Sequence, residues 1–201
     1  MKLRTAIKRN LREENGSFSV EAILMFPLLA WAFIAMFVFF EGLRESNINL
    51  KAAYTVSDLL SRQEEVVIND DYMAGMHRIY AWLSRSAQPV QLRVTVVRYD
   101  ETSDEHVRVW SEGVGVPSLE QEAINENVTP HVPILADAAV AIVVETWAEY
   151  EPIIDVGLAD TELYNIVVTT PRFADQLLYD GIGAGTGDEH RDGPEDENND
   201  V

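Results

Sequence analysis

The stretch AILMFPLLAWAFIAMFVFF, residues 22–40, decides the fold of this chain of 201 residues. It holds 19 consecutive positions without a charged side chain. Nineteen helical residues rise about 28 Å, which is close to the ~30 Å thickness of the hydrocarbon layer of a bilayer. The core helix of a soluble protein normally carries polar positions every few residues, and this stretch has none. Residues 22–40 therefore predict a single membrane-spanning helix.

Pro27 lies inside this apolar stretch. A proline in a helix removes the hydrogen bond to the carbonyl four residues earlier, here that of Ile23. Membrane helices tolerate proline, often with a bend. We therefore expect a kink of the helix at Pro27.

The residues before the span are polar and basic. Residues 1–16 (MKLRTAIKRNLREENG) contain five basic side chains, Lys2, Arg4, Lys8, Arg9 and Arg12. Beyond the span, Arg44 and Lys51 are offset by Glu41 and Glu45. Because basic residues accumulate on the cytoplasmic side of a span, the N-terminus is predicted to be cytoplasmic and the chain after residue 41 periplasmic.

The helical pattern continues beyond the span. Apolar and amide side chains recur at spacings of three and four residues up to about Arg62, at Leu43, Asn47, Leu50, Tyr54 and the pair Leu59–Leu60. This spacing is typical of one buried helix face. Residues 17–62 are therefore predicted to form one long helix, half of it in the membrane and half outside.

Two shorter helices are predicted within the domain at residues 63–180. The first covers residues 70–85, with Asn69 or Asp70 as its N-cap. Its inward face would carry Tyr72, Met76, Ile79, Tyr80 and Leu83. The second covers residues 119–127 and would begin with a capping box from Ser118 to Gln121.

Four segments of the domain have the pattern of β-strands. Residues 90–99 (VQLRVTVVRY) alternate Val90, Leu92, Val94 and Val96 with Gln91, Arg93 and Thr95. Residues 106–110 return after a polar turn, so the two segments predict a hairpin. Residues 138–150 and 162–170 predict a second β-rich pair. The fold class is therefore α+β: a long N-terminal helix, a small antiparallel sheet and short helices.

The junction between the basic leader and the span, Asn15-Gly16-Ser17-Phe18-Ser19-Val20-Glu21, resembles a class III signal peptide. A prepilin peptidase cuts such a leader after the glycine and leaves the span in place. Cleavage after Gly16 would create an amine at Ser17, which lies on the same helix face as Glu21 because the two are four residues apart. Pairing of this amine with Glu21, within one subunit or between neighbours, would offset the cost of a carboxylate at the membrane edge and set the axial register of packed subunits.

Two other interpretations of this junction are open. A secretory signal peptide places small residues after its apolar region, whereas no such site follows Phe40. A glycine five positions before a glutamate also occurs by chance, and Glu21 would then be a solvated residue at the membrane interface. The basic leader before the junction and the uninterrupted span after it favour processing.

The chain resembles the TadE/TadF family of minor pseudopilins of the tight-adherence (Tad, or Flp) pilus system. The resemblance rests on Gly16 to Glu21 and on Pro27 soon after the glutamate, over about 25 residues. Two later segments are also similar to the family, VVETWAEYEP at 143–152 and TTPRF at 169–173. The resemblance does not distinguish the E type from the F type.

The resemblance implies a structural or assembly role in adherence and surface attachment. The partners it implies are the prepilin peptidase, other pilins and pseudopilins, the inner-membrane pilus platform with its ATPase, and the lipid bilayer. The alternative is an unprocessed single-pass inner-membrane protein whose periplasmic domain binds a ligand or an envelope partner.

Composition excludes several other functions. The chain carries 15 Lys and Arg against 34 Asp and Glu, a formal net charge of −19, and such acidity argues against nucleic acid as a partner. It contains no cysteine, so disulfides, thiolate metal sites and a cysteine nucleophile are excluded.

No catalytic, metal or cofactor motif is recognised. The four histidines are scattered in the sequence, at His77, His106, His131 and His190. The acidic run from Asp100 to Glu105 is interpreted as a solvated hairpin turn, because it lacks the glycine of a calcium loop. Residues 181–201 begin with alternating glycines and end in an acidic run, and we expect a flexible, disordered tail there rather than a phosphate-binding loop. We therefore expect no enzymatic activity and no cofactor.

Overall fold

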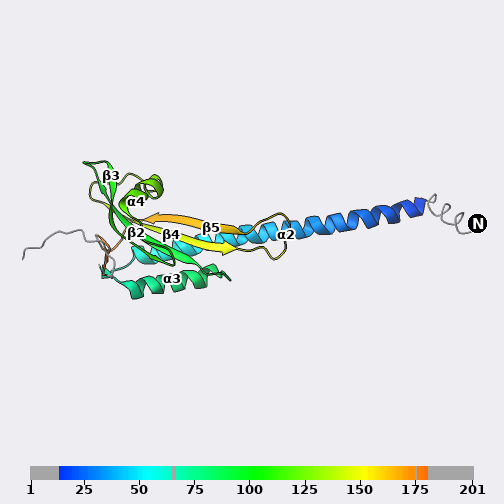
Figure 1. The fold of residues 1–201 in the computed structure, drawn as a ribbon, viewed down its shortest axis with the longest axis horizontal. Coiled ribbons are helices and arrows are strands. Elements are labelled where there is room, and N and C mark those ends of the chain that lie inside the picture. Colours follow the sequence, from blue (N-terminus) through cyan, green and yellow to red (C-terminus); the bar gives the residue numbers. More distant parts are fainter. Residues whose placement is uncertain (1–13, 65–66, 175, 181–201) are drawn as a thin grey trace, which may run out of the picture.

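The computed structural model describes residues 14–64, 67–174 and 176–180. Most of the basic leader and all of the Gly-rich acidic tail, including His190, lie outside the described residues. Within them the chain has the predicted α+β fold, with one long helix, an antiparallel sheet and short helices (Figure 1).

The dominant element is helix α2, Glu14–Ser61, which is 48 residues long. It begins three residues before the predicted start at 17 and runs without a break through Pro27 (Figure 1). Its length is about 72 Å, more than twice the thickness of the hydrocarbon layer of a bilayer. The N-terminal part of α2 projects well beyond the folded domain (Figure 1).

The two halves of α2 lie in different environments. In the apolar half, almost every large side chain is exposed, and Ile23, Phe26 and Phe33 are each at least 70% exposed. This half is long and apolar enough to cross a membrane. The C-terminal half packs against helix α3 (Asp70–Ser84) and strands β4 (Val140–Tyr150) and β5 (Thr161–Thr169).

The predicted inward stripe of this second half is wrong for most of its members. Leu43 and Tyr54 are 67% and 57% exposed, Asn47, Leu50 and Leu59 are also exposed, and only Leu60 of the stripe is buried. The buried face instead carries Asn49, Ala52, Ala53, Val56, Ser57, Leu60 and Ser61. Small side chains let the helix approach the sheet closely, so the bulky residues are left on the opposite side.

Helix α3 agrees with the prediction over residues 70–85, ending one residue earlier. The side chain of Asn69 accepts a hydrogen bond from the backbone N–H of Tyr72, which confirms it as the N-cap. Met76 and Tyr80 are buried, and the Tyr80 hydroxyl donates to Asn49 of α2 at 3.0 Å. This bond fixes α3 against the long helix.

Both predicted strand pairs are present and join into one sheet. β2 (Gln91–Asp100) pairs with β3 (Glu105–Val114), and β4 pairs with β5. Antiparallel pairing of β2 with β4 unites them in the order β3-β2-β4-β5. The β2–β3 turn and the β4–β5 loop lie at opposite ends of this sheet (Figure 1).

The expected alternation of buried and solvated positions in β2 is only half correct. Leu92, Val94 and Val96 face the core formed with α2 and α3, as predicted. Arg93, Thr95 and Val97 are also buried. The reason is a second small core on the other face, where helix α4 (Gln121–Asn127) and the 3-10 turn Thr129–His131 cover part of the sheet.

The predicted capping box of α4 is wrong. The helix begins at Gln121 with Glu120 as its N-cap, and no side chain caps it. The Gln121 side chain instead accepts from the backbone N–H of Arg108 and donates to the carbonyl of His106. Gln121 therefore joins α4 to strand β3.

A short parallel pair was not predicted. β1 (Val67–Ile68) pairs with β6 (Leu178–Tyr179), beyond the C-terminal end of α2. The indole N–H of Trp110 donates to the carbonyl of Leu177, and the Trp110 ring stacks on Tyr179. These contacts hold the end of the described chain on the domain.

We expect Ala52→Leu to destabilise the domain by about 1–3 kcal/mol, because Ala52 is 2% exposed and a larger side chain would force the helix away from the sheet. Tyr54→Leu, at an exposed neighbouring position, is the control and should change stability little. Urea unfolding of the detergent-solubilised chain, followed by tryptophan fluorescence, measures both. Equal stability of the two variants would contradict the helix orientation described above.

Candidate functional site

The residues of the predicted processing site lie at the N-terminal end of α2. Gly16 and Ser17 belong to its first turns. Glu21 is exposed and lies where the apolar half begins, and none of the described side chains forms an ion pair with it. Because the helix is continuous from Glu14, positions 17 and 21 are one turn apart on the same face.

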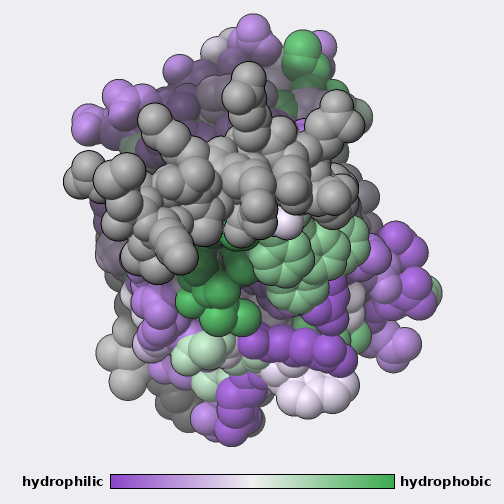
Figure 2. Space-filling view, turned by 90° about the vertical axis from the view of Figure 1, so that its right-hand side faces the viewer, coloured by the Kyte–Doolittle hydropathy of each residue, from purple (hydrophilic) through white to green (hydrophobic). Residues whose placement is uncertain are grey.

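The apolar half of α2 has no cover from the rest of the described chain until about residue 33. Seen from the N-terminal end of this helix, apolar side chains gather near the middle of the view, and hydrophilic side chains occupy much of the domain around them (Figure 2). An exposed apolar surface of this length requires a non-aqueous environment or a protein partner.

The domain first meets α2 at the outer end of the apolar stretch. The hydroxyl of Tyr150, the last residue of β4, donates to the carbonyl of Val38 at 3.4 Å. Gly42 makes room for this contact, since a Cβ there would lie 3.3 Å from the Tyr150 ring and 3.4 Å from the Leu158 side chain. Tyr150 and Pro152 belong to the segment 143–152 that carries part of the family resemblance.

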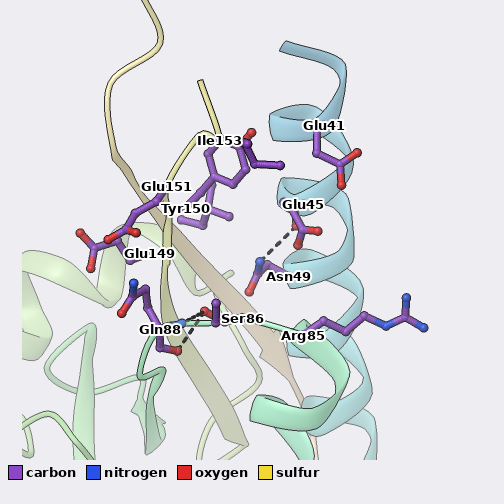
Figure 3. A pocket seen from close by; sticks show the side chains of 12 residues that line it. Glu41, Glu45, Asn49, Arg85, Ser86, Gln88, Glu149, Tyr150, Glu151 and Ile153 are labelled. Atoms are coloured by element: carbon purple, nitrogen blue, oxygen red, sulfur yellow. Dashed lines mark hydrogen bonds between the residues drawn. The ribbon is translucent and has the colours of Figure 1, made fainter. Parts of the chain in front are cut away.

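A polar hollow of about 250 Å³ lies beside this contact. Glu41, Glu45, Glu149 and Glu151 contribute carboxylates to its lining, and the Arg85 side chain extends away from them (Figure 3). No group of acidic or histidine side chains within the described ranges has a geometry that could hold a metal ion. The four carboxylates therefore give this end of the domain a negative surface.

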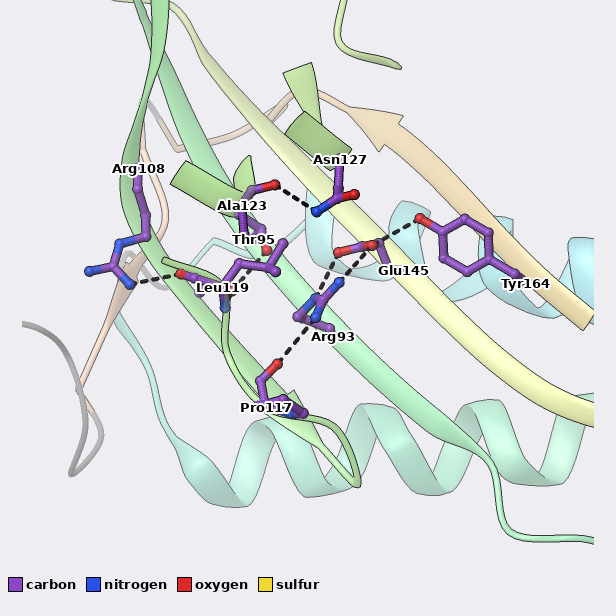
Figure 4. Close-up of polar contacts among 10 residues, drawn as sticks. Arg93, Thr95, Arg108, Pro117, Leu119, Ala123, Asn127, Glu145 and Tyr164 are labelled. Carbon is purple, nitrogen blue, oxygen red and sulfur yellow. Dashed lines mark hydrogen bonds and ion pairs between the residues drawn. The ribbon is translucent and has the colours of Figure 1, made fainter. Parts of the chain in front are cut away.

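The strongest polar cluster lies on the other face of the sheet, and the sequence did not predict it. Arg93 of β2 and Glu145 of β4 are directly opposed in register and form two hydrogen bonds of 2.8 Å each (Figure 4). Arg93 also donates to the Pro117 carbonyl at 3.2 Å, and its guanidinium lies 4.9 Å from the centre of the Trp147 ring. The hydroxyl of Tyr164 donates to Glu145 at 2.9 Å.

This cluster is a satisfied structural pair. Arg93 is 7% exposed and Glu145 1% exposed, so both charges are nearly withdrawn from water. The bidentate geometry and the additional partners compensate for that burial. Both charged groups are therefore engaged by partners within the domain.

An open hollow of about 620 Å³ adjoins this cluster, and Trp147, Tyr164 and His131 contribute to its lining. Trp147 and Tyr164 lie in neighbouring strands with ring centres 5.3 Å apart. The only signals in the sequence were single charges within apolar strands, Arg93 in VQLRVTVV and Glu145 in AIVVETW. Their pairing depends on the register of two strands more than 50 residues apart.

The described histidines lie on separate elements. His77 contacts the Val90 carbonyl at 2.8 Å through its Nε2 and is a boundary residue of α3, as predicted. His106 is buried beside the Tyr99 ring, and His131 is exposed at the end of the 3-10 turn. In the acidic turn, Asp100 accepts from the N–H of Thr102, and the Tyr99 hydroxyl donates to Asp104. These carboxylates therefore serve the hairpin turn.

The second segment of the family resemblance, 169–173, lies against the end of α2. The backbone N–H of Arg172 donates to the Ser61 carbonyl at 2.8 Å, and its side chain pairs with Asp58. Arg172 thereby holds the chain after β5 on the long helix.

The chain matches no protein-family model, no curated protein and no solved structure. The resemblance to TadE/TadF pseudopilins therefore stays a prediction that rests on the residues named above.

We expect Glu145→Gln to lower the free energy of unfolding by about 3–5 kcal/mol, because it leaves the buried Arg93 charge without a counter-charge. Asp58→Asn, which removes an exposed partner of Arg62 and Arg172, is the matched control and should cost less than about 1 kcal/mol. Urea unfolding of the full chain in detergent measures both variants. Similar losses for the two would show that the Arg93–Glu145 pair is not desolvated.

We also expect stability to fall above pH 10. Burial, and then the charge and hydrogen bond of Glu145, raise the pKa of Tyr164 above its ordinary value of 10.0. Above that pH the unfolded chain loses the phenolic proton while the folded chain retains it, so the free energy of unfolding decreases as pH rises. Tyr164→Phe should make this decrease shallower in unfolding curves recorded from pH 9 to pH 12, and an unchanged slope would contradict the role of Tyr164.

Proposed function

We propose that this chain is a minor pseudopilin similar to TadE/TadF proteins, a structural or assembly component of a Tad/Flp-type pilus that serves adherence. The observation that carries the proposal is the division of α2. Its first half exposes apolar side chains over a length that matches a bilayer, and its second half is the packing surface of an antiparallel sheet. One helix thus links a membrane anchor directly to a folded domain, as the resemblance implies.

The membrane orientation is part of the proposal. The basic residues before the span favour a cytoplasmic N-terminus. The sheet and the short helices would then lie in the periplasm, on the outer side of the inner membrane.

Processing would occur between Gly16 and Ser17. The new amine of Ser17 would lie one helical turn from Glu21, at the cytoplasmic edge of the span. A carboxylate at a bilayer edge is stabilised by a cationic partner, from its own subunit or from a neighbouring one. This pairing would set the height of each subunit relative to the next in the membrane or at the base of a filament.

The partners of such a subunit are the prepilin peptidase, other pilins and pseudopilins, and the inner-membrane platform with its ATPase. The exposed residues on the outer side of α2, Leu43, Leu50 and Tyr54, are available for contact with such subunits. A structural role is supported by the Arg93–Glu145 cluster and by the Tyr99–Asp104 contact, whose charged groups are occupied by internal hydrogen bonds.

The alternative function is a single-pass membrane protein that is not processed and whose periplasmic domain binds a ligand. The open hollow beside Trp147 and Tyr164 is the feature that favours it, because accessible aromatic rings beside polar groups are common in ligand sites. Processing of the leader distinguishes the two functions.

The intact mass of the membrane-extracted protein tests the proposal, in cells with and without the prepilin peptidase. We expect loss of residues 1–16 only when the peptidase is present. A full-length mass in both strains would overturn the pseudopilin proposal and favour the ligand-binding alternative.

Gly16→Val is the matched variant for this experiment. It should keep the full-length mass in cells that contain the peptidase, because the larger side chain at the cleavage position blocks processing. Removal of residues 1–16 from this variant would show that cleavage does not depend on Gly16.

A further inference from the structure

The loop between β4 and β5, residues 151–160, lies alongside the end of the apolar half of α2. It follows Tyr150, whose hydroxyl reaches the Val38 carbonyl, and it includes Leu158, which packs at Gly42. Both contacts are at the end of the sheet that points along the projecting part of the helix (Figure 1). The loop is therefore the part of the domain that extends furthest toward the N-terminal half of α2.

The tip of this loop is apolar and exposed. Ile153 is 87% exposed and Ile154 48% exposed. Both line an apolar hollow of about 210 Å³ together with Phe33, Phe37 and Val38 of α2. Full burial of an isoleucine side chain is favourable by about 1.5–3 kcal/mol, so two adjacent exposed isoleucines beside exposed phenylalanines indicate an apolar environment around them.

The position of this tip along α2 identifies that environment. Phe33 lies seven residues before Phe40, the end of the apolar stretch, which corresponds to about 10 Å along the helix axis. Amphipathic segments at a membrane surface bury their apolar side chains to a depth of about 5–10 Å. When the apolar stretch is in a bilayer, the isoleucines therefore lie at the depth of the outer interface.

The polar groups of the loop limit how deeply it enters. Glu151 and Asp155 flank the isoleucines, and a carboxylate is tolerated at the bilayer edge but not at its centre. Irregular backbone exposed to lipid is not stable in the hydrocarbon core, because its N–H and C=O groups lack partners. The Tyr150 hydroxyl lies where aromatic residues with a polar end accumulate at membrane interfaces. These constraints place only the isoleucine side chains among the lipid chains.

We infer that the β4–β5 loop is a second membrane contact, in which Ile153 and Ile154 insert into the outer leaflet beside α2. This inference rests on the proposed membrane anchoring of α2 and goes beyond it. The span alone leaves α2 and its domain free to tilt in any direction relative to the bilayer. The loop adds a second point of contact on one side of α2 and thereby favours a tilt that brings this side toward the lipid surface.

Single cysteines carrying an environment-sensitive fluorophore test this inference, since the natural chain contains no cysteine. The full chain is reconstituted in vesicles of phosphatidylcholine and phosphatidylglycerol. Ile153→Cys reports the loop tip and Phe37→Cys reports the span. Ile134→Cys is the matched control, because Ile134 is 81% exposed and lies in the segment before β4, near the opposite end of the sheet. The quenchers are nitroxide-labelled lipids and aqueous iodide.

We expect the labels at positions 153 and 37 to emit at shorter wavelength and to be quenched by the nitroxide lipids. Iodide quenching at position 153 should be several-fold weaker than at position 134. Lipid quenching at position 37 together with iodide quenching at position 153 would overturn the inference about the loop. The proposed membrane anchoring of α2 would then still hold. Shielding of position 153 from both quenchers would also overturn it, because a protein would then cover the loop.

Iodide quenching at positions 37 and 153 together would overturn the membrane anchor itself, and the loop contact with it. Circular dichroism and unfolding of each labelled variant show that the domain is folded during the measurement. Since Ile153 is exposed, its replacement should leave the unfolding curve unchanged.

Discussion

The close packing of the small-residue face of α2 on the sheet is the contact on which the rest of the structure depends. Ala52, Ala53 and Val56 are almost completely buried there, and the bulky side chains of Leu43, Leu50 and Tyr54 lie exposed. Because the helix is continuous, this contact fixes the direction in which its apolar half leaves the domain. It also brings Tyr150 and the β4–β5 loop within reach of the apolar stretch.

Local sequence patterns predicted most of the elements. The apolar stretch at 22–40, the cap at Asn69 and the alternating strand segments each depend on residues close together in the chain, and each is present as expected. The inward face of α2 was predicted wrongly, because large residues were assumed to point into the core. The buried face of α2 depends on how closely the helix approaches the sheet. The sequence pattern of the helix alone does not determine this distance.

The sequence patterns also missed contacts between elements that are far apart in the chain. Arg93 and Glu145 are opposed only because β2 and β4 are neighbours in the sheet, and the sequence patterns identified two pairs but not how they join. Arg93 and Thr95 were expected to be solvated, whereas the segment around α4 covers part of that face. The pairing of β1 with β6 involves two residues from each strand, too few to produce a recognisable pattern.

The face of the sheet that points away from α2 and α3 has two different parts. One part of this face is a small apolar core beneath α4, and the other carries a buried ion pair with two aromatic rings. A buried ion pair contributes less to stability than a well-packed apolar pair, but it tolerates little change in register. It therefore favours one alignment of the two central strands.

The parallel pairing of β1 with β6 has a consequence for how the molecule can be studied. The backbone N–H of Asp180 donates to the Ile68 carbonyl, which lies seven residues after the end of α2. The last described residues therefore lie at the end of the domain opposite the apolar half of the long helix (Figure 1). A fluorescent protein or affinity tag attached after this point would be joined to the domain at the end remote from the exposed apolar side chains of α2.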